Sequence, residues 1–333
     1  MKLGTSVRFL FPTSPATHER FRSLLASIPK GAFIERPMGA YAPDEQARNL
    51  MEVAAAARAA GLDALLTGDS HGANPGYAAT FSPLPTVARL MSVTGDMPIG
   101  VVLLAPFYHP ALLAEQIGTL AAFAGGPLIV TFVLGGRPPQ FAAFGMEEKS
   151  RVGRLEEVVA ITRALLAGER VTRQGRYYTL DATISPLPRV PVEIWLGGTV
   201  AASAERAGRL GDAWLTGQNA TDEELRRQLD LYRAAASRAG RVPRPVLRRD
   251  IYVGESDEEA RAVVGAILAE GYRGTGFDRL LVGSAASVVE SLGRYRDMGF
   301  DYVMVRHIVG DHALMLRSFE RIGRDVMPRI RDL

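Results

Sequence analysis

Residues 194–216 read IWLGGTVAASAERAGRLGDAWLT, and this stretch decides the fold. An apolar run ends at Gly197, Gly198 and Thr199, an alanine-rich run with helical spacing follows, and Gly211 and Asp212 lead into a second apolar run. This order is typical of a β-α-β unit, in which a helix connects two parallel strands. The stretch therefore predicts strand, helix and strand in direct succession.

The same alternation extends over the whole chain. We expect strands at residues 3–11, 63–67, 98–104, 128–134, 192–196, 213–216, 246–253 and 301–306. Helical patterns occupy residues 44–60, 84–94, 110–122, 150–167, 200–210, 221–239, 257–270 with 285–298, and 312–326. Eight such repeats in 333 residues predict an α/β fold of the TIM-barrel type, with eight parallel strands inside a ring of helices and one domain over residues 1–333. An open doubly wound sheet is the alternative.

Three helix-to-strand joins share a pattern of glycine followed by aspartate. They read AAGLDALL, GRLGDAWL and DMGFDYVMV, with the glycines at positions 61, 211 and 299. Glycine is the residue expected just after the end of a helix, because it adopts a left-handed backbone without strain. We interpret the three joins as one structural device that recurs around a barrel.

Composition limits the functional classes. The formal charge is only +3 and basic residues alternate with acidic ones, so no nucleic-acid-binding stripe is present. The chain has no cysteine, which excludes disulfides, thiolate metal sites and a cysteine nucleophile. The first residues do not resemble a secretory signal, and no run of eighteen apolar residues occurs. We therefore expect a cytoplasmic protein without nucleic-acid or membrane partners.

One connection is much longer than the others. About thirty residues, from Pro12 to Pro43, separate the first strand from its helix. A loop of this length after a barrel strand is usually an active-site lid or a binding loop on the catalytic face. A solvent-facing insertion with its own short helix is the alternative.

The opening stretch also carries a candidate binding site. Gly197, Gly198 and Thr199 follow a strand and precede a helix, whose first N–H groups and positive dipole end attract anions. Glycine lets the backbone approach a ligand, and threonine adds a hydroxyl group. The stretch is either a phosphate site or a tight turn with a threonine cap.

A longer set of motifs resembles the luciferase-like monooxygenase family. It comprises the strand, His-Pro pair and helix of residues 101–126, the glycine–arginine loop with F..FG at 135–145, the helix of Arg151 and Glu156, and IWLGG with GDAW. These motifs occur in the family's order and spacing, over roughly residues 45–310. The closing RDVMPRI is also similar to the family's last helix.

The resemblance implies a TIM barrel that binds FMN, or the related deazaflavin coenzyme F420, at the carboxyl ends of its strands. In the family the flavin ring rests against a bulge in the third strand, often with a non-proline cis peptide, which maps to Val101, Val102 and Leu103. The loop of Gly135, Gly136 and Arg137 lies beside the phosphate site, which maps to Gly197, Gly198 and Thr199. No metal is implied.

The stretch LLTGDSH at the end of the second strand holds the candidate acid–base residues. Asp69 and His71 match positions that are acidic and histidine in the family, but Ser70 stands where a catalytic histidine is common. His71 is then the nearest imidazole that could act as an acid or base. The alternative is that His71 and Asp69 only stabilise the loop.

Other candidates are weaker. His307 follows the last strand and could serve as a second acid or base, and Arg306 could bind an anion or form a surface salt bridge. We interpret His109, next to Pro110, as structural. Trp195 and Trp214 are expected in the core, and Tyr177 and Tyr178 are expected in a β-hairpin.

These observations predict a flavin-dependent oxidoreductase. The GGRPPQF loop favours FMN as the cofactor. With FMN, the resemblance implies a monooxygenase that uses reduced FMN and O2 on a small organic substrate, a separate flavin reductase and a homo-oligomeric state. Deazaflavin-dependent hydride transfer and a non-catalytic flavin-binding barrel are the alternatives. A metal-dependent hydrolase lacks its H-x-H spacing, and a Schiff-base aldolase lacks a lysine at a strand end.

Overall fold

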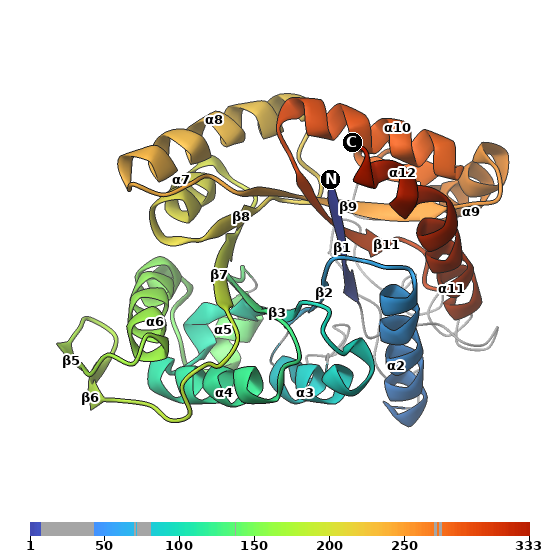
Figure 1. Ribbon diagram of the computed structural model, residues 1–333. Coiled ribbons are helices and arrows are strands. Elements are labelled where there is room, and N and C mark those ends of the chain that lie inside the picture. The colour runs from blue at the N-terminus through green and yellow to red at the C-terminus, as the bar shows by residue number, and fades with distance from the viewer. Residues whose placement is uncertain (8–42, 70, 72–80, 137, 270–271, 273–274) are drawn as a thin grey trace. The chain divides into compact units, whose positions relative to one another are not determined.

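The computed structural model describes all of the chain except residues 8–42, 70, 72–80, 137, 270–271 and 273–274 (Figure 1). Ser70 and Arg137 therefore lie outside the described residues. So does the predicted lid or insertion at residues 12–43, apart from its last residue.

The strand order decides between the two predicted architectures. The main sheet runs in the hydrogen-bonded order β10-β9-β11-β1-β2-β3-β4-β7-β8, and β8 pairs in turn with β9. From β9 the pairings pass through seven further strands and return to β9, so eight strands form a closed parallel β-barrel. The TIM-barrel prediction is confirmed and the open sheet is excluded.

The eight barrel strands lie where the sequence predicts them. They are β1 (Lys2–Val7), β2 (Leu65–Thr67), β3 (Ile99–Leu104), β4 (Leu128–Val133), β7 (Val192–Gly197), β8 (Ala213–Leu215), β9 (Pro245–Val253) and β11 (Tyr302–His307). The sequence analysis missed β10 (Leu280–Gly283), which pairs with the second half of β9 outside the ring. Its four residues are too few to show a period.

Contacts divide the described chain into two compact units. Unit 1 comprises Met1–Leu65, Ala73–Phe81 and Arg248–Leu333, and unit 2 comprises Leu66–Gly72 and Ser82–Leu247. The chain passes from one unit to the other within β2 and between adjacent residues of β9. The expectation of a single domain over residues 1–333 stays a prediction.

In unit 1, β1 pairs with β11 in parallel register from Lys2 opposite Tyr302 to Thr5 opposite Val305. The unit's helices are α2 (Pro43–Ala59), α9 (Asp257–Ala269), α10 (Ala285–Met298), α11 (His312–Arg321) and α12 (Met327–Arg331). Helix α2 packs against α11, and α10 packs against α12. A one-turn π-helix, Ile322–Val326, joins α11 to α12.

In unit 2, β3 pairs with β4, and β4 pairs with β7. The helices are α3 (Pro83–Thr94), α4 (Pro110–Phe123), α5 (Pro138–Ala143), α6 (Arg151–Leu166), α7 (Ala201–Leu210) and α8 (Asp222–Arg238). Helix α7 packs along α8, and α4 packs against α6 (Figure 1). Trp195 and Trp214 are fully buried, as expected of core residues.

The predicted hairpin also belongs to unit 2. Strands β5 (Val171–Gln174) and β6 (Thr179–Ala182) pair in antiparallel register, with Tyr177 and Tyr178 between them. The Glu157 carboxylate on α6 accepts hydrogen bonds from the backbone N–H groups of Arg176, Tyr177 and Tyr178. Helix α6 therefore holds the turn of this hairpin through a single buried carboxylate.

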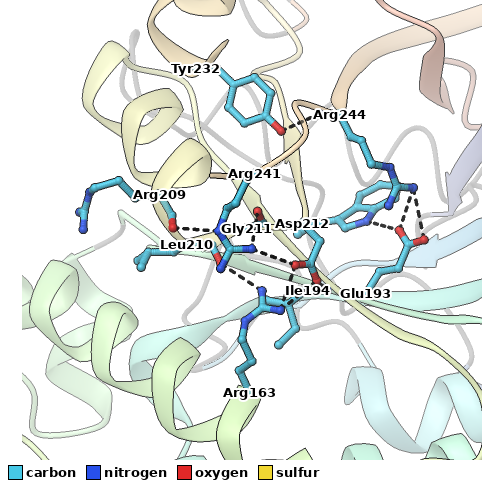
Figure 2. A network of polar contacts seen from close by, with 11 residues as sticks. Arg163, Glu193, Ile194, Arg209, Leu210, Gly211, Asp212, Tyr232, Arg241 and Arg244 are labelled. Carbon is cyan, nitrogen blue, oxygen red and sulfur yellow. Dashed lines mark hydrogen bonds and ion pairs between the residues drawn. The ribbon is translucent and has the colours of Figure 1, made fainter. Parts of the chain in front are cut away.

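Two of the three glycine–aspartate joins have the same geometry. Asp212 exchanges hydrogen bonds with Ile194 on the neighbouring strand, donating its N–H to the carbonyl at 2.7 Å and accepting the Ile194 N–H on its carboxylate at 2.8 Å (Figure 2). Asp63 does the same with Leu3, at 2.8 and 2.7 Å. The carboxylate thus extends the sheet ladder by one more bond at the amino end of the strand.

Arginines complete both joins. Arg163 and Arg241 lie 2.9 and 3.3 Å from the Asp212 carboxylate and also donate to the carbonyls of Leu210 and Gly211 (Figure 2). Arg331 binds the Asp63 carboxylate at 2.8 Å and the Gly61 carbonyl. The third join differs: the Asp301 carbonyl accepts the Lys2 N–H, but its carboxylate has no partner among the residues that the structure describes.

The glycines of the joins are not alike. Gly61 and Gly299 have φ angles of 72° and 106°, as predicted for helix-ending glycines. Gly211 is the C-cap of α7, as predicted, but its φ of −93° is not left-handed. Its small size matters instead, because a Cβ would lie 2.9 Å from the Ala213 carbonyl oxygen.

In the described part of the chain, no helix has both the length and the apolar character needed to span a lipid bilayer.

Candidate functional site

The predicted site residues of unit 2 lie at the carboxyl ends of neighbouring parallel strands. Asp69 and His71 follow β2, Leu103 and Leu104 end β3, Gly135 and Gly136 follow β4, and Gly197 ends β7. In the sheet these strands stand in the order β2-β3-β4-β7. Carboxyl ends of parallel barrel strands are where TIM-barrel enzymes bind their ligands.

Asp69 is the polar centre of this group. Its side chain is fully buried, and Oδ2 accepts hydrogen bonds from the Leu104 N–H at 3.0 Å and the Tyr108 hydroxyl at 2.9 Å. The Nε2 atom of His71 lies 2.9 Å from Oδ1 and 3.1 Å from Oδ2. One carboxylate therefore joins the end of β2 to the end of β3, and it contacts both an imidazole and a phenol.

His71 lies in an aromatic surrounding. Its ring meets those of Phe107, Tyr108 and Phe144 edge to face, with centroids 5.4–5.6 Å apart. Its backbone carbonyl accepts a hydrogen bond from Gln140 on α5. The His71 side chain is 22% exposed, whereas its partner Asp69 is fully buried. The imidazole is therefore accessible on one side and bound to a buried carboxylate on the other.

Tyr108 is a site residue that the sequence analysis missed. It follows the short 3-10 helix Ala105–Phe107 after β3, and its hydroxyl lies 2.9 Å from Asp69 and 3.2 Å from His71 Nε2. Burial, together with the Asp69 carboxylate, raises the pKa of the Tyr108 phenol far above its ordinary value. The phenol is therefore a constant donor. Its only sequence signal was its place next to the His109-Pro110 pair at a strand end.

A residue of the β5–β6 hairpin binds the backbone of Tyr108. The Tyr178 hydroxyl donates to the Tyr108 carbonyl at 3.2 Å, and the Tyr178 ring meets the His109 ring edge to face. His109 itself is exposed and occupies the N-cap position of α4, where its carbonyl accepts the Leu113 N–H. This is consistent with the structural interpretation of His109.

The bulge expected in the third strand does not interrupt the pairing of β3 with β4. Val101, Val102 and Leu103 pair with Val130, Thr131 and Phe132 in unbroken register. Among the described residues the one cis peptide bond joins Ser185 to Pro186. Val101 and Leu103 are buried and Val102 is partly exposed, so the three residues form a regular strand.

The loop after β4 approaches β3. Gly135 has a φ of 69°, and a Cβ there would lie 3.5 Å from the Leu104 side chain. Gly136 is exposed, and a Cβ there would meet no atom within 4 Å. Arg137, the next residue of this loop, is outside the described residues.

Gly197, Gly198 and Thr199 form an open backbone turn before α7. The Gly198 N–H donates to the Leu215 carbonyl at 3.2 Å, and the Val200 N–H donates to the Ser203 hydroxyl at 3.1 Å. The described residues provide no hydrogen-bond partner for the N–H groups of Thr199, Ala201 and Ala202. A Cβ on Gly198 would collide with the Ser203 side chain, so the turn requires glycine.

The sequence placed the helix cap one residue too early. The N-cap is Val200 rather than Thr199, and the Ser203 hydroxyl accepts the Val200 N–H. Thr199 is exposed, and its carbonyl accepts a hydrogen bond from the buried Gln228 on α8 at 3.2 Å. The threonine hydroxyl is thus not needed as a cap.

The side chain of His307 is buried against a helix, a position that does not suit a second acid or base. It lies in unit 1, where its Nε2 is 2.9 Å from the Ser318 hydroxyl and its ring packs on Phe319, both on α11. Burial lowers the pKa of His307 to about 3. The neutral imidazole therefore connects β11 to α11.

Arg306 forms neither an anion site nor a surface salt bridge. It pairs with Asp250 at 2.7 Å, and the two side chains are only 6% and 1% exposed. The Tyr272 hydroxyl lies within 3.0 Å of both groups. The ion pair is therefore a buried element of unit 1.

Comparison with known proteins identifies the family. A family model described as luciferase-like monooxygenase matches residues 31–280, which is three quarters of the chain. The chain belongs to the luciferase-like monooxygenase family. The resemblance noted in the sequence is thereby confirmed, and the strand ends described above are the region that this family's fold offers to ligands.

Members of the family with different cofactors are similar to this chain. An FMNH2-dependent dimethylsulfone monooxygenase of Pseudomonas putida is 28% identical over 280 residues, 73% of this chain and 77% of that protein. An F420-dependent glucose-6-phosphate dehydrogenase of Beutenbergia cavernae is 28% identical over 325 residues, 85% of this chain and 94% of that protein. Both relatives are oxidoreductases.

Solved structures share the fold. The monooxygenase RslO1 from Streptomyces bottropensis superposes with a TM-score of 0.79 at 22% identity, covering 98% of this chain and 99% of that chain.

Proposed function

We propose that this chain is a flavin-dependent oxidoreductase, and specifically a monooxygenase that uses reduced FMN and O2 on a small organic substrate. The observation that carries the proposal is the turn Gly197–Gly198–Thr199 at the end of β7, in the same unit as Asp69 and His71. The family membership and the FMNH2-dependent relative support FMN as the cofactor.

The turn fits a phosphate group. The N–H groups of Thr199, Ala201 and Ala202 have no partner among the described residues, and they stand at the amino end of a ten-residue helix. Such N–H groups and the helix dipole both favour an anion. Thr199 is exposed, so its backbone and hydroxyl are accessible to a ligand. Arg137 would add a guanidinium from the loop after β4, on the evidence of the sequence alone.

The remaining residues define what surrounds the cofactor and substrate. Val101, Val102, Leu103, Gly135 and Gly136 would border the flavin ring from the ends of β3 and β4. The rings of Phe107 and Phe144 would give His71 a partly apolar surrounding. Bound flavin supplies the redox chemistry, and this chain supplies proton transfer through His71, with Asp69 as its partner.

Coenzyme F420 is the second candidate cofactor, because an F420-dependent relative aligns with 85% of this chain. With that cofactor the same residues would support hydride transfer without O2. A non-catalytic binding barrel is disfavoured, because the relatives are enzymes. A separate flavin reductase, a homo-oligomeric state and a cytoplasmic location remain part of the proposal as family-based expectations.

The test is a binding titration of the purified protein with FMN, coenzyme F420 and riboflavin. We expect one phosphorylated cofactor to bind at least about tenfold more tightly than riboflavin, since a charge-assisted hydrogen bond contributes about 1.5–3 kcal/mol. Thr199→Glu, which places a carboxylate beside the free N–H groups, should remove that advantage and leave riboflavin binding nearly unchanged.

Val242→Glu is the matched control, because Val242 is 80% exposed and lies between α8 and β9. It adds the same charge away from the turn and should leave all three affinities at the parental values. If Thr199→Glu lowers FMN and riboflavin affinity equally, or changes neither, the phosphate assignment is wrong. Mixing protein that holds the chemically reduced cofactor with O2 then separates the two cofactor classes, because reduced FMN is oxidised by O2 and the reduced deazaflavin is a hydride donor that does not use O2.

A further inference from the structure

The hydrogen bonds around His71 assign a role to Tyr108. We propose that Tyr108 is a positioning residue, which together with Asp69 holds His71 with its proton on Nε2 and leaves Nδ1 as the atom that exchanges a proton with substrate. The inference rests on the proposed function, because it takes His71 to be the acid or base.

The carboxylate determines which nitrogen carries the proton. His71 Nε2 lies 2.9 and 3.1 Å from the two oxygens of Asp69, and a carboxylate can only accept. The neutral imidazole therefore carries its hydrogen on Nε2. The described residues provide no partner for Nδ1, whose lone pair is then available.

Tyr108 reinforces this arrangement. Its phenol stays protonated and donates to Asp69 Oδ2 at 2.9 Å. Its oxygen lies 3.2 Å from His71 Nε2 and faces that nitrogen with lone pairs, because its hydrogen is directed at the carboxylate. The Asp69 carboxylate and the Tyr108 oxygen can thus both accept a hydrogen bond from Nε2. Neither group stabilises the tautomer that carries its hydrogen on Nδ1.

One oxygen of the carboxylate is held by two further donors. Its Oδ2 accepts from the Leu104 N–H as well as from Tyr108, and the side chain is fully buried. Tyr108 is held in turn by the bond from the Tyr178 hydroxyl to its carbonyl. A chain of hydrogen bonds thus runs from the hairpin through Tyr108 and Asp69 to His71, as in sites whose catalytic base is oriented by a third group.

The first experiment needs no cofactor. Two-dimensional NMR that correlates the ring nitrogens and carbon-bound protons of histidine identifies the tautomer of each ring at pH 8, and His71→Gln assigns the signal among the five histidines. We expect His71 to show a protonated Nε2 and an unprotonated Nδ1. Asp69→Asn and Tyr108→Phe should each shift His71 toward a mixture of tautomers, and Tyr177→Phe should not.

Tyr177→Phe is a matched control, because the Tyr177 ring packs on Arg154 and makes no contact with Asp69 or His71 in the described structure. A protonated Nδ1 in the parent protein would overturn the inference. It would also be overturned if Tyr108→Phe kept the parental tautomer. Because Tyr108→Phe removes only one oxygen, it keeps the test valid if Asp69→Asn fails to fold.

The second experiment measures turnover of the loaded enzyme. Tyr108→Phe should lower kcat about threefold to tenfold, the effect of one hydrogen bond, and Asp69→Asn on the order of a hundredfold, while cofactor affinity changes less than about twofold. Equal losses in kcat and cofactor affinity would show a merely structural role and contradict the inference. Parental turnover in His71→Ala would contradict the proposed function, whereas the tautomer result stands independently of it.

Discussion

At the scale of single residues, two histidines at strand ends have opposite environments. His71 is partly exposed and contacts a buried carboxylate, whereas His307 is buried against α11 and contacts a serine hydroxyl. The sequence offered both as acid–base candidates because each follows a barrel strand. Which one can exchange a proton with a ligand depends on where the side chain points.

The role of His71 is testable by removing its imidazole. We expect His71→Ala to lower turnover by about a hundredfold or more, the contribution typical of general acid–base catalysis, with little change in cofactor affinity. Steady-state kinetics with a parallel cofactor titration measures both. Turnover at the parental rate would make His71 a loop-stabilising residue.

His307 should instead affect stability as a function of pH. Its pKa is lowered to about 3 by burial, whereas a histidine in an unfolded chain titrates near about 6.5. Between these values the unfolded state binds a proton that the folded state does not, so stability falls as the pH is lowered through this window. His307→Gln should flatten the dependence between pH 6 and 5 by up to about 1.4 kcal/mol per pH unit.

Urea unfolding at pH 7, 6 and 5 provides the measurement. His109→Gln is the control, because His109 is exposed at the start of α4. It should leave the dependence on pH as in the parent. A His307→Gln variant that also keeps the parental dependence would show that His307 has the same pKa in the folded and the unfolded protein.

At the scale of elements, the glycine–aspartate joins show how a recurring sequence pattern can have two structural outcomes. Asp63 and Asp212 each bind an N–H of the neighbouring strand and at least one arginine. Asp301 has the same place in the sequence pattern, yet its side chain is exposed and has no partner in the described chain. The pattern predicts the join, but the neighbouring arginines decide what the carboxylate does.

This difference predicts unequal effects of one substitution. Asp212→Ala should lower the free energy of unfolding by about 1–3 kcal/mol, because the Ile194 N–H and two arginines lose a charged acceptor. Asp301→Ala should change it by less than about 0.5 kcal/mol. Chemical denaturation of both variants tests the comparison, and equal losses would mean that the join is stabilised by backbone geometry alone.

At the scale of the whole molecule, eight strands close into one barrel, while the contacts of the chain separate into two compact units. Both tryptophans, Trp195 and Trp214, lie in unit 2, so tryptophan fluorescence reports on that unit alone. This distribution provides a direct test of the single-domain prediction.

We expect one cooperative unfolding transition. Denaturation followed by tryptophan fluorescence should have the same midpoint as hydrogen exchange of backbone amides in β1 and β11, which belong to unit 1. Coincident midpoints are the expected result, since β2 and β9 each contribute residues to both units. Separate midpoints would show that the two units fold as independent domains.

The sequence by itself determined the strand-helix order, the positions of the eight barrel strands and the family. These follow from local patterns, because apolar runs, helical periodicity and helix-ending glycines each depend on residues close together in the chain. The same locality allowed Asp69 and Gly197 to be placed at strand ends. It did not place the helix cap, since Ser203 rather than Thr199 bonds the first turn.

Only the tertiary structure decided which side chains meet. Tyr108 is 39 residues from Asp69 in the chain. The Tyr108 hydroxyl meets the Asp69 carboxylate because β2 and β3 are neighbours in the sheet and their carboxyl ends lie side by side. His307 faces α11. Alternate residues of a strand point to opposite sides of the sheet, so the sequence shows that neighbouring residues differ in direction but not which of them faces the site. Long-range packing, and not local propensity, selects the partner of each polar group.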